Sequence, residues 1–194
     1  MILTSSYLRE QAAKRNITEY SQQRILNENA EFFKKSITKT YDIFLSHSSL
    51  DKKQVLTLLK LFNEAGYTVY VDWIEDTQLD RNNVTKATAQ VLKNRMKTSK
   101  GLSYLTTSNS TSSKWCPWEL GFFDGLKDER CCILPVMDYS TYSFKGQEYL
   151  GLYPYIKYQQ NTTGKYDFWV HNQTSDEYTV LSSWLNGTNP YKHK

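Results

Sequence analysis

Between residues 41 and 137, short apolar runs alternate with longer segments whose apolar residues recur at helical spacing. This alternation constrains the fold more than any other feature of the sequence, because short apolar runs are typical of buried strands and helical spacing is typical of helices. Strands that alternate with helices predict βαβ units and a parallel sheet covered on both faces. With right-handed crossovers, the prediction is an α/β domain of the flavodoxin-like, doubly wound type.

Approximate bounds for these elements follow from the same pattern. We expect strands at residues 41–46, 67–71, 101–106 and 131–137. We expect helices at residues 51–65, 84–97 and 114–126, with Gly66 placed where a helix C-cap favours glycine. The polar connections 72–83 and 108–113 are expected to be loops. The pattern weakens after residue 137, where we expect a fifth strand at 152–158 and a closing helix at 176–185.

The first 38 residues differ from the rest of the chain, because they are polar and carry few apolar positions. A thin apolar stripe of this kind is typical of helices that lie on a surface. We therefore expect an N-terminal helical extension at residues 1–38, of one or two helices that cap the domain or mediate assembly. The α/β domain itself is expected at residues 39–190.

Composition excludes several classes of protein. The net charge of +4 is too small to indicate a nucleic-acid partner. The three cysteines (Cys116, Cys131 and Cys132) are odd in number, so we expect reduced thiols in a cytoplasmic protein and a buried structural role for Cys116. The three histidines show no metal-ligand spacing with them, and we expect no metal site. The apolar run at 131–137 is too short to cross a bilayer, and no membrane role is expected.

Ligands of a doubly wound sheet bind outside the carboxyl ends of its strands. Residues 46–49, the 72–83 loop and the 108–113 loop meet at that edge of the predicted sheet. The chain has neither a dinucleotide-binding glycine motif nor a P-loop. A phosphorylated receiver domain is also disfavoured, because Thr106 and Thr107 stand where its aspartate is needed. The candidate binding residues at this edge are Ser46, His47, Ser48, Asp72, Trp73, Ser113 and Trp115.

Glu119 is the candidate with the most unusual surroundings. Helical spacing puts Trp115, Phe122 and Phe123 on the same side of the helix as Glu119. A carboxylate among large aromatic rings is desolvated, which is common at functional sites. We expect it to face an open crevice lined by these rings. The alternative is a glutamate in the first helical turn that is stabilised by the helix dipole or by Lys114.

Two other kinds of candidate also have alternatives. His47 could contact a phosphate or a ribose, or it could be a partly exposed loop residue. Trp73 and Trp115 could stack on a ligand ring, or they could pack in the core.

Three segments resemble bacterial TIR domains. Residues 41–52 (YDIFLSHSSLDK) resemble the opening strand and turn of the family, and residues 67–73 (YTVYVDW) resemble the second strand, which leads into its BB loop. Residues 113–120 (SKWCPWEL) resemble the S-x-W-C-x-x-E-L signature. The three matches occur in the family's order and cover about residues 41–137.

The resemblance implies a five-stranded parallel sheet and NAD+ nucleosidase activity, with Glu119 as the catalytic residue. NAD+ would be a substrate, so no cofactor is implied. The products would be nicotinamide and ADP-ribose, a cyclic isomer or a conjugate. In bacteria such domains serve antiphage defence, including Thoeris-type systems in which the product activates a separate effector protein.

The resemblance also implies self-association through TIR domains. The 72–83 loop belongs to the same face as Glu119 and could cover the site of a neighbouring copy, so we expect a composite site and a low basal rate. The BB loop at 78–83 lacks the glycine that many relatives place there.

Two alternatives remain open. The chain could be a TIR interaction module without enzymatic activity, or another N-glycosidase such as a relative of nucleoside deoxyribosyltransferases. The intact signature at 113–119 favours the NAD+-cleaving enzyme, because an interaction module does not need the glutamate.

Overall fold

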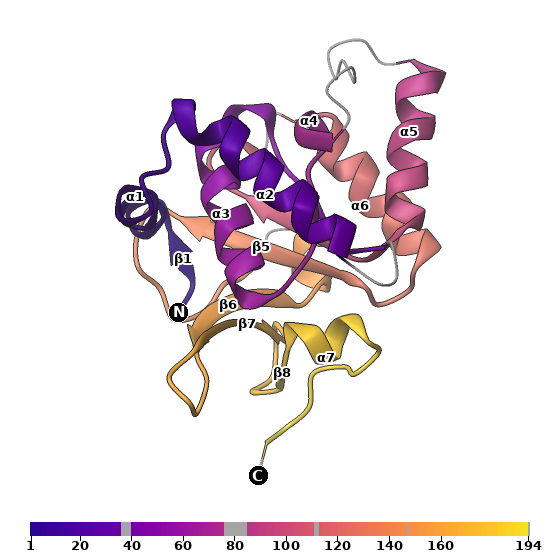
Figure 1. Cartoon of the computed structure of the whole chain (residues 1–194). Coiled ribbons are helices and arrows are strands. Elements are labelled where there is room, and N and C mark those ends of the chain that lie inside the picture. The colour runs from indigo at the N-terminus through magenta and orange to yellow at the C-terminus, as the bar shows by residue number, and fades with distance from the viewer. Residues whose placement is uncertain (36–39, 76–84, 111–112, 147, 194) are drawn as a thin grey trace.

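A mostly parallel sheet runs through the molecule, with helices on both of its faces (Figure 1). The computed structural model describes residues 1–35, 40–75, 85–110, 113–146 and 148–193. The strands are β1 (Leu3–Thr4), β2 (Tyr41–Ser46), β3 (Val69–Tyr70), β4 (Ser99–Thr106), β5 (Cys131–Met137), β6 (Tyr155–Gln160), β7 (Tyr166–His171) and β8 (Tyr178–Val180). The helices are α1 (Ser5–Lys14), α2 (Gln22–Lys35), α3 (Lys52–Ala65), α4 (Asp72–Glu75), α5 (Lys86–Lys97), α6 (Trp115–Leu126) and α7 (Leu181–Leu185).

The centre of the sheet confirms the predicted fold class. Strands β3, β2, β4, β5 and β6 lie in this order and pair in parallel, as a flavodoxin-like domain requires. The bounds of β2 and β5 agree with the predicted strands, because both are buried almost throughout, and apart from Asp42 and Ser46 of β2 their side chains are apolar. Strand β3 is shorter than the strand predicted at 67–71, because only Val69 and Tyr70 pair with β2.

Two hydrophobic cores cover the two faces of the sheet. The first lies under α1, α2, α3 and α7, and the second lies under α5 and α6. Helix α3 is buried all round its middle turns, because every residue from Val55 to Leu59 is buried, and Leu61 and Phe62 extend its contribution to the first core. It ends at Gly66, whose φ of 98° is the left-handed conformation expected of a glycine cap. Helix α5 begins at a capping box between Thr85 and Thr88.

The first 35 residues form two helices, where one or two were predicted, and also a strand that was not predicted. In β1, Leu3 pairs in parallel with Val136 of β5. Leu8 of α1 and Ile25 of α2 are buried in the same core as α3. The segment is therefore packed onto the sheet and onto α3 (Figure 1). The boundary at residue 39 stays a prediction.

The C-terminal part departs from the predicted elements. The fifth strand begins at Tyr155 instead of residue 152, and residues 176–185 hold β8 followed by the short helix α7. Strands β6, β7 and β8 are antiparallel neighbours that extend the parallel sheet. The prediction of a single closing helix was wrong, because Tyr178–Val180 pairs with β7 before the chain turns helical.

The predicted loop at 72–83 is also corrected at its start. Asp72 and Trp73 lie in the short helix α4, not in irregular chain. The rest of that loop, with the BB-loop residues 78–83, lies outside the described residues.

Other expectations concern cysteines, metals and membranes. All three cysteines are buried and form no disulfide, which agrees with the expected reduced thiols. Within the described ranges, no three histidine, cysteine or acidic side chains gather in a way that could hold a metal ion. No described helix combines the length and apolar character needed to span a membrane.

Candidate active site

The carboxyl end of β2 meets the first turns of α6 through a direct side-chain contact. Ser46 is the last residue of β2, and its hydroxyl donates a hydrogen bond of 2.6 Å to Oε2 of Glu119. Both side chains are fully buried. A hydrogen bond to a charged acceptor is short and strong, so Ser46 fixes the direction in which the carboxylate points. The next two strands of the chain, β3 and β4, lie on opposite sides of β2, so the pair sits at the topological switch point of the sheet.

The surroundings of Glu119 agree only in part with the sequence prediction. Trp115 and Phe123, one turn away on either side, are buried beside it in the second core. Phe122 instead stacks on Trp118 with ring centroids 5.7 Å apart, and both rings are half-buried. The expected open crevice was wrong for this conformation, because Glu119 has no exposed surface.

The buried His47 and Asp72 and the half-buried Trp73 form a cluster that directly follows Ser46 at the end of β2. The indole Nε1 of Trp73 donates a hydrogen bond of 2.8 Å to Nε2 of His47, and Nδ1 of His47 lies 2.8 Å from the carbonyl oxygen of Leu45. An indole N–H can only donate, so Nε2 must accept, and the proton of His47 sits on Nδ1. The histidine is therefore the neutral tautomer that donates to Leu45.

The carboxylate of Asp72 lies close to the same nitrogen, with Oδ1 at 3.4 Å from Nε2. This contact would be an ion pair only if His47 were protonated at Nε2. The indole already uses the single lone pair of that nitrogen, so we assign the closer indole contact as the hydrogen bond. His47 is 1% exposed, which excludes the alternative of a partly exposed loop histidine.

Two predicted binding serines act as helix caps in this structure. The hydroxyl of Ser48 accepts a hydrogen bond from the backbone N–H of Leu50 at the start of a 3-10 turn, Ser49–Asp51. The hydroxyl of Ser113 accepts one from the backbone N–H of Cys116 in the first turn of α6. Capping satisfies N–H groups that a helix leaves unpaired. Both serines thus shape the loops around Glu119.

A further polar cluster at this edge was not predicted as a site. Asp51 is fully buried at the start of α3 and accepts hydrogen bonds from the Thr107 hydroxyl (2.8 Å) and the Asn109 amide (2.7 Å). These contacts join the loop after β4 to the loop after β2. An aspartate before a predicted helix is the only signal in the sequence, and its partners lie far away along the chain.

Tyr104 of β4 pairs with Ser46 in the sheet and extends the site toward the following loops. Burial raises the pKa of the Tyr104 hydroxyl, and Cys116, Tyr149 and Glu119 add to this effect. The phenol therefore stays protonated at neutral pH and can act only as a neutral hydrogen-bonding group.

A hollow of about 470 Å³ opens at the carboxyl ends of β4 and β5, near this edge. Its lining includes Thr106, Ser108, Met137 and Phe144, but not Glu119. The volume lies in the range of ligand-binding pockets. The hollow therefore lies at the carboxyl edge of the sheet, as Glu119 does, but it does not reach the covered carboxylate.

Comparison with known families decides what kind of domain carries this arrangement. Residues 43–168 match the TIR domain family. The chain belongs to the TIR family. The match spans β2 to β7, so it includes Ser46, the His47 cluster and the whole of α6 with Glu119.

Two relatives extend the comparison. The TIR chain is 48% identical over 151 residues to the "Probable 3' cyclic ADP-D-ribose synthase ThsB'" of Bacillus cereus (strain MSX-D12), which covers 76% of each chain. It is 36% identical over 96 residues to the "Putative cyclic ADP-D-ribose synthase TIR2" of Cytobacillus dafuensis. That second match covers 49% of this chain and 25% of the relative.

Proposed function

We propose that this TIR protein cleaves the nicotinamide–ribose bond of NAD+, with Glu119 as the catalytic residue. The observation that carries the proposal is the Glu119 carboxylate, held by Ser46 at the carboxyl edge of the sheet of a TIR domain. The names of two relatives as cyclic ADP-D-ribose synthases support the same class of reaction. We place the reaction in the cytoplasm, where the substrate is found.

One carboxylate is enough for this reaction. The bond between ribose C1′ and the pyridinium nitrogen breaks with both electrons going to nitrogen, so nicotinamide leaves as a neutral molecule. A glycosidase needs a second carboxyl group to protonate its leaving oxygen, but this leaving group needs no proton. The positive charge that develops on the ribose is stabilised by an ionised carboxylate nearby, and Glu119 supplies it.

The contact with Ser46 prepares the carboxylate for this role. Ser46 donates a hydrogen bond to Oε2 of Glu119, and we propose that the carboxylate oriented in this way accepts hydrogen bonds from the ribose hydroxyls when the substrate binds. Since Glu119 has no exposed surface, substrate reaches it only after the side chains around it move. We therefore propose that the described structure is a closed form with low basal activity.

We propose that the remaining candidate residues position the elements around Glu119 and do not contact the substrate themselves. His47 directly follows Ser46, and its contacts with Trp73 and Leu45 hold the end of β2 in place. Trp115 lies one turn before Glu119, and its buried ring excludes water from that side of α6. We propose that Asp72, Ser48 and Ser113 contribute to the site through the loop positions that they fix.

We propose a cyclic product in place of linear ADP-ribose. In such a product a hydroxyl group of the same ADP-ribosyl unit attacks C1′ and releases its proton, whereas water gives the linear product. The two relatives named as cyclic ADP-D-ribose synthases support ring closure. The resemblance to Thoeris-type TIR proteins further supports a role in antiphage defence, in which a separate effector protein responds to this product.

The proposal is tested by incubating purified protein with NAD+ and measuring nicotinamide and ADP-ribose products by chromatography and mass spectrometry. Glu119→Gln keeps the shape of the side chain but removes its charge, and we expect a loss of at least about 100-fold. The control is Glu10→Gln, a surface glutamate whose side chain is 56% exposed. Equal rates for wild type and Glu119→Gln would remove Glu119 from the mechanism.

Protein concentration separates a silent enzyme from an interaction module. If the site is completed by a second copy, the rate per molecule rises with protein concentration, and it reaches a plateau when association is complete. No nicotinamide release at any concentration, together with clear self-association, would favour the interaction module. Full activity of a monomer at nanomolar concentration would exclude a composite site.

A further inference from the structure

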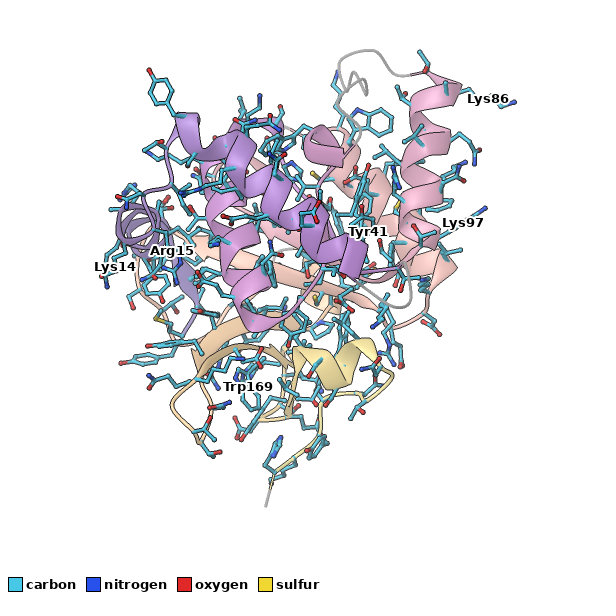
Figure 2. All side chains as sticks on the ribbon, viewed as in Figure 1. Lys14, Arg15, Tyr41, Lys86, Lys97 and Trp169 are labelled. Atoms are coloured by element: carbon cyan, nitrogen blue, oxygen red, sulfur yellow. The ribbon has the colours of Figure 1, made fainter. Side chains whose placement is uncertain are left out.

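The outer face of the antiparallel end of the sheet carries a second set of polar and aromatic groups. In register across the strands, Tyr155 of β6 pairs with His171 of β7, which pairs with Tyr178 of β8. Lys157 lies two residues from Tyr155 and therefore points to the same face. Trp169, its partner on β7, is labelled at this end of the molecule in Figure 2.

This face lies well away from Glu119. Four strand-to-strand steps separate β2, which carries Ser46, from β7, which carries His171. At about 4.8 Å a step, the separation across the sheet is about 19 Å. Figure 1 shows β7 and β8 at the opposite end of the molecule from α4 and α5. A ligand at this face would not touch the catalytic carboxylate.

The face contains a hollow of about 470 Å³, a size that suits a small metabolite. Tyr155, Lys157, His171 and Tyr178 belong to its lining on the strands. The rim is polar and consists of Ser143 and the loop residues Asn172, Gln173, Thr174, Ser175 and Asp176. Hydroxyl and amide groups can donate hydrogen bonds to the hydroxyl groups of a ligand or accept them, and a carboxylate can accept them.

The rim is held in shape by bonds within its own loop. Glu177 accepts hydrogen bonds from the Asn172 amide (2.7 Å) and the Ser175 hydroxyl (2.8 Å). The Gln173 amide donates to the carbonyl oxygen of Tyr153 (3.0 Å). A loop fixed by such contacts loses little conformational freedom when it binds a ligand, so the pocket is largely preformed.

Two side-chain nitrogens in this pocket lack a polar partner among the residues that the structure describes. The His171 side chain is 9% exposed, and its Nε2 finds no hydrogen-bond partner in the part of the chain that the structure describes. Among the same residues, the Lys157 ammonium forms no ion pair and lies over the Tyr155 ring at 5.6 Å. A buried polar nitrogen without a partner costs free energy unless something else satisfies it.

The rings and charges restrict which ligand fits. Both His171 and His193 stack on Tyr178, with ring centroids 5.1 Å and 4.0 Å away, so protein rings already occupy the stacking surface that a flat base would need. The lysine supplies one positive charge for an anionic group, and Asp176 supplies a carboxylate that suits hydroxyl groups. We propose that this pocket binds a phosphorylated sugar, with the phosphate on Lys157 and His171 and the sugar hydroxyls on the polar rim.

A phosphorylated sugar can be free or part of a nucleotide, and the experiment separates the two. Purified wild-type protein is titrated with ribose 5-phosphate, AMP, ribose or inorganic phosphate, and the histidine ring signals are followed by NMR. The chain has only three histidines, so their signals can be assigned by single substitutions. We expect ribose 5-phosphate to shift the His171 signals and to leave His47, beside Glu119, unchanged.

The matched variants are Lys157→Met, which keeps the length of the side chain, and Lys165→Met, an exposed lysine in the turn before β7. We expect Lys157→Met to weaken ribose 5-phosphate binding about tenfold or more and Lys165→Met to leave it unchanged. Both variants should release nicotinamide from NAD+ at the wild-type rate. Thermal melting of each variant shows whether it is folded.

Several outcomes would overturn the proposal. One is the absence of any His171 shift at millimolar ribose 5-phosphate, and another is equal affinity of wild type and Lys157→Met. Inorganic phosphate that binds as tightly as ribose 5-phosphate would reduce the pocket to a simple anion site. Shifts of His47 alone would place the ligand at the catalytic edge instead. Tighter binding of AMP than of ribose 5-phosphate supports the nucleotide as the source of the sugar phosphate.

Discussion

The hydroxyl of Ser46 and the carboxylate of Glu119 are joined by a 2.6 Å hydrogen bond that links the end of β2 to α6. The two residues lie 73 positions apart in the sequence, and both are fully buried. The contact orients a charged group that has no exposed surface of its own. The stability of the fold and the proposed catalytic role of Glu119 therefore depend on the same serine.

Ser46→Ala tests this double role. The variant leaves Oε2 of Glu119 with one donor fewer, so we expect the free energy of unfolding to fall by about 1–3 kcal/mol. We also expect kcat for nicotinamide release to fall while KM changes little, because orientation of the carboxylate is lost. Ser103→Ala is the control, since Ser103 is equally buried on β4 but contacts Cys132. A kcat unchanged by Ser46→Ala would limit Ser46 to a structural role.

Trp73→Phe tests the assigned tautomer of His47. The variant removes the indole N–H that donates to Nε2, while Asp72 remains 3.4 Å from that nitrogen. We expect ¹⁵N NMR of the wild type at neutral pH to show a protonated Nδ1 and an unprotonated Nε2. In the variant, Nε2 should take up a proton and donate toward Asp72. A wild-type ring protonated at Nε2 would contradict the assignment.

Gly101→Ala tests how closely α7 packs on β4. A Cβ at this position would lie 2.6 Å from Cδ2 of Leu185 and 3.0 Å from Cζ3 of Trp184. We expect a loss of about 1–3 kcal/mol in the free energy of unfolding by denaturant, since overpacking forces such side chains to move. Gly121→Ala on α6 is the control. Nothing lies within 4 Å of its added Cβ, so the higher helix propensity of alanine should raise stability by up to about 1 kcal/mol.

The pH dependence of stability contains a contribution from His171. Burial lowers the pKa of His171 to about 4, and Lys157 adds to the effect. An unfolded chain binds this proton at about 6.5, so the unfolded state holds more protons between these pH values. The free energy of unfolding should therefore fall as the pH drops from about 6.5 to about 4. His171→Phe keeps a ring between Tyr155 and Tyr178, and denaturant melts should show a smaller fall than in wild type.

The sequence predicted those elements whose residues carry a strong local pattern of apolar side chains or glycine. Strand β5 is an unbroken apolar run, and Gly66 ends α3 as its conformational freedom suggests. Strand β8 was missed because three residues carry too little pattern and are held by pairing with β7. Strand β1 is shorter still, and its pairing with β5 joins residues more than 130 positions apart.

The site shows the same division between local and distant contacts. Glu119 stands out because its aromatic neighbours lie one helical turn away, which sequence spacing reveals. The complete burial of Glu119 and its hydrogen bond to Ser46 depend on packing between β2 and α6, which sequence spacing does not reveal. The bonds from Asp51 to Thr107 and Asn109 also cross more than 50 positions and escaped prediction for that reason.

The two outermost strands of the sheet, β3 and β8, are only two and three residues long. A long, regular edge strand offers its free backbone groups to any other strand, and this is a common route to aggregation. Edges as short as these present little backbone for such pairing. If copies of this protein associate, as the proposed composite site requires, the short edges favour recognition through side chains on loops and helices, which permits specific and reversible assembly.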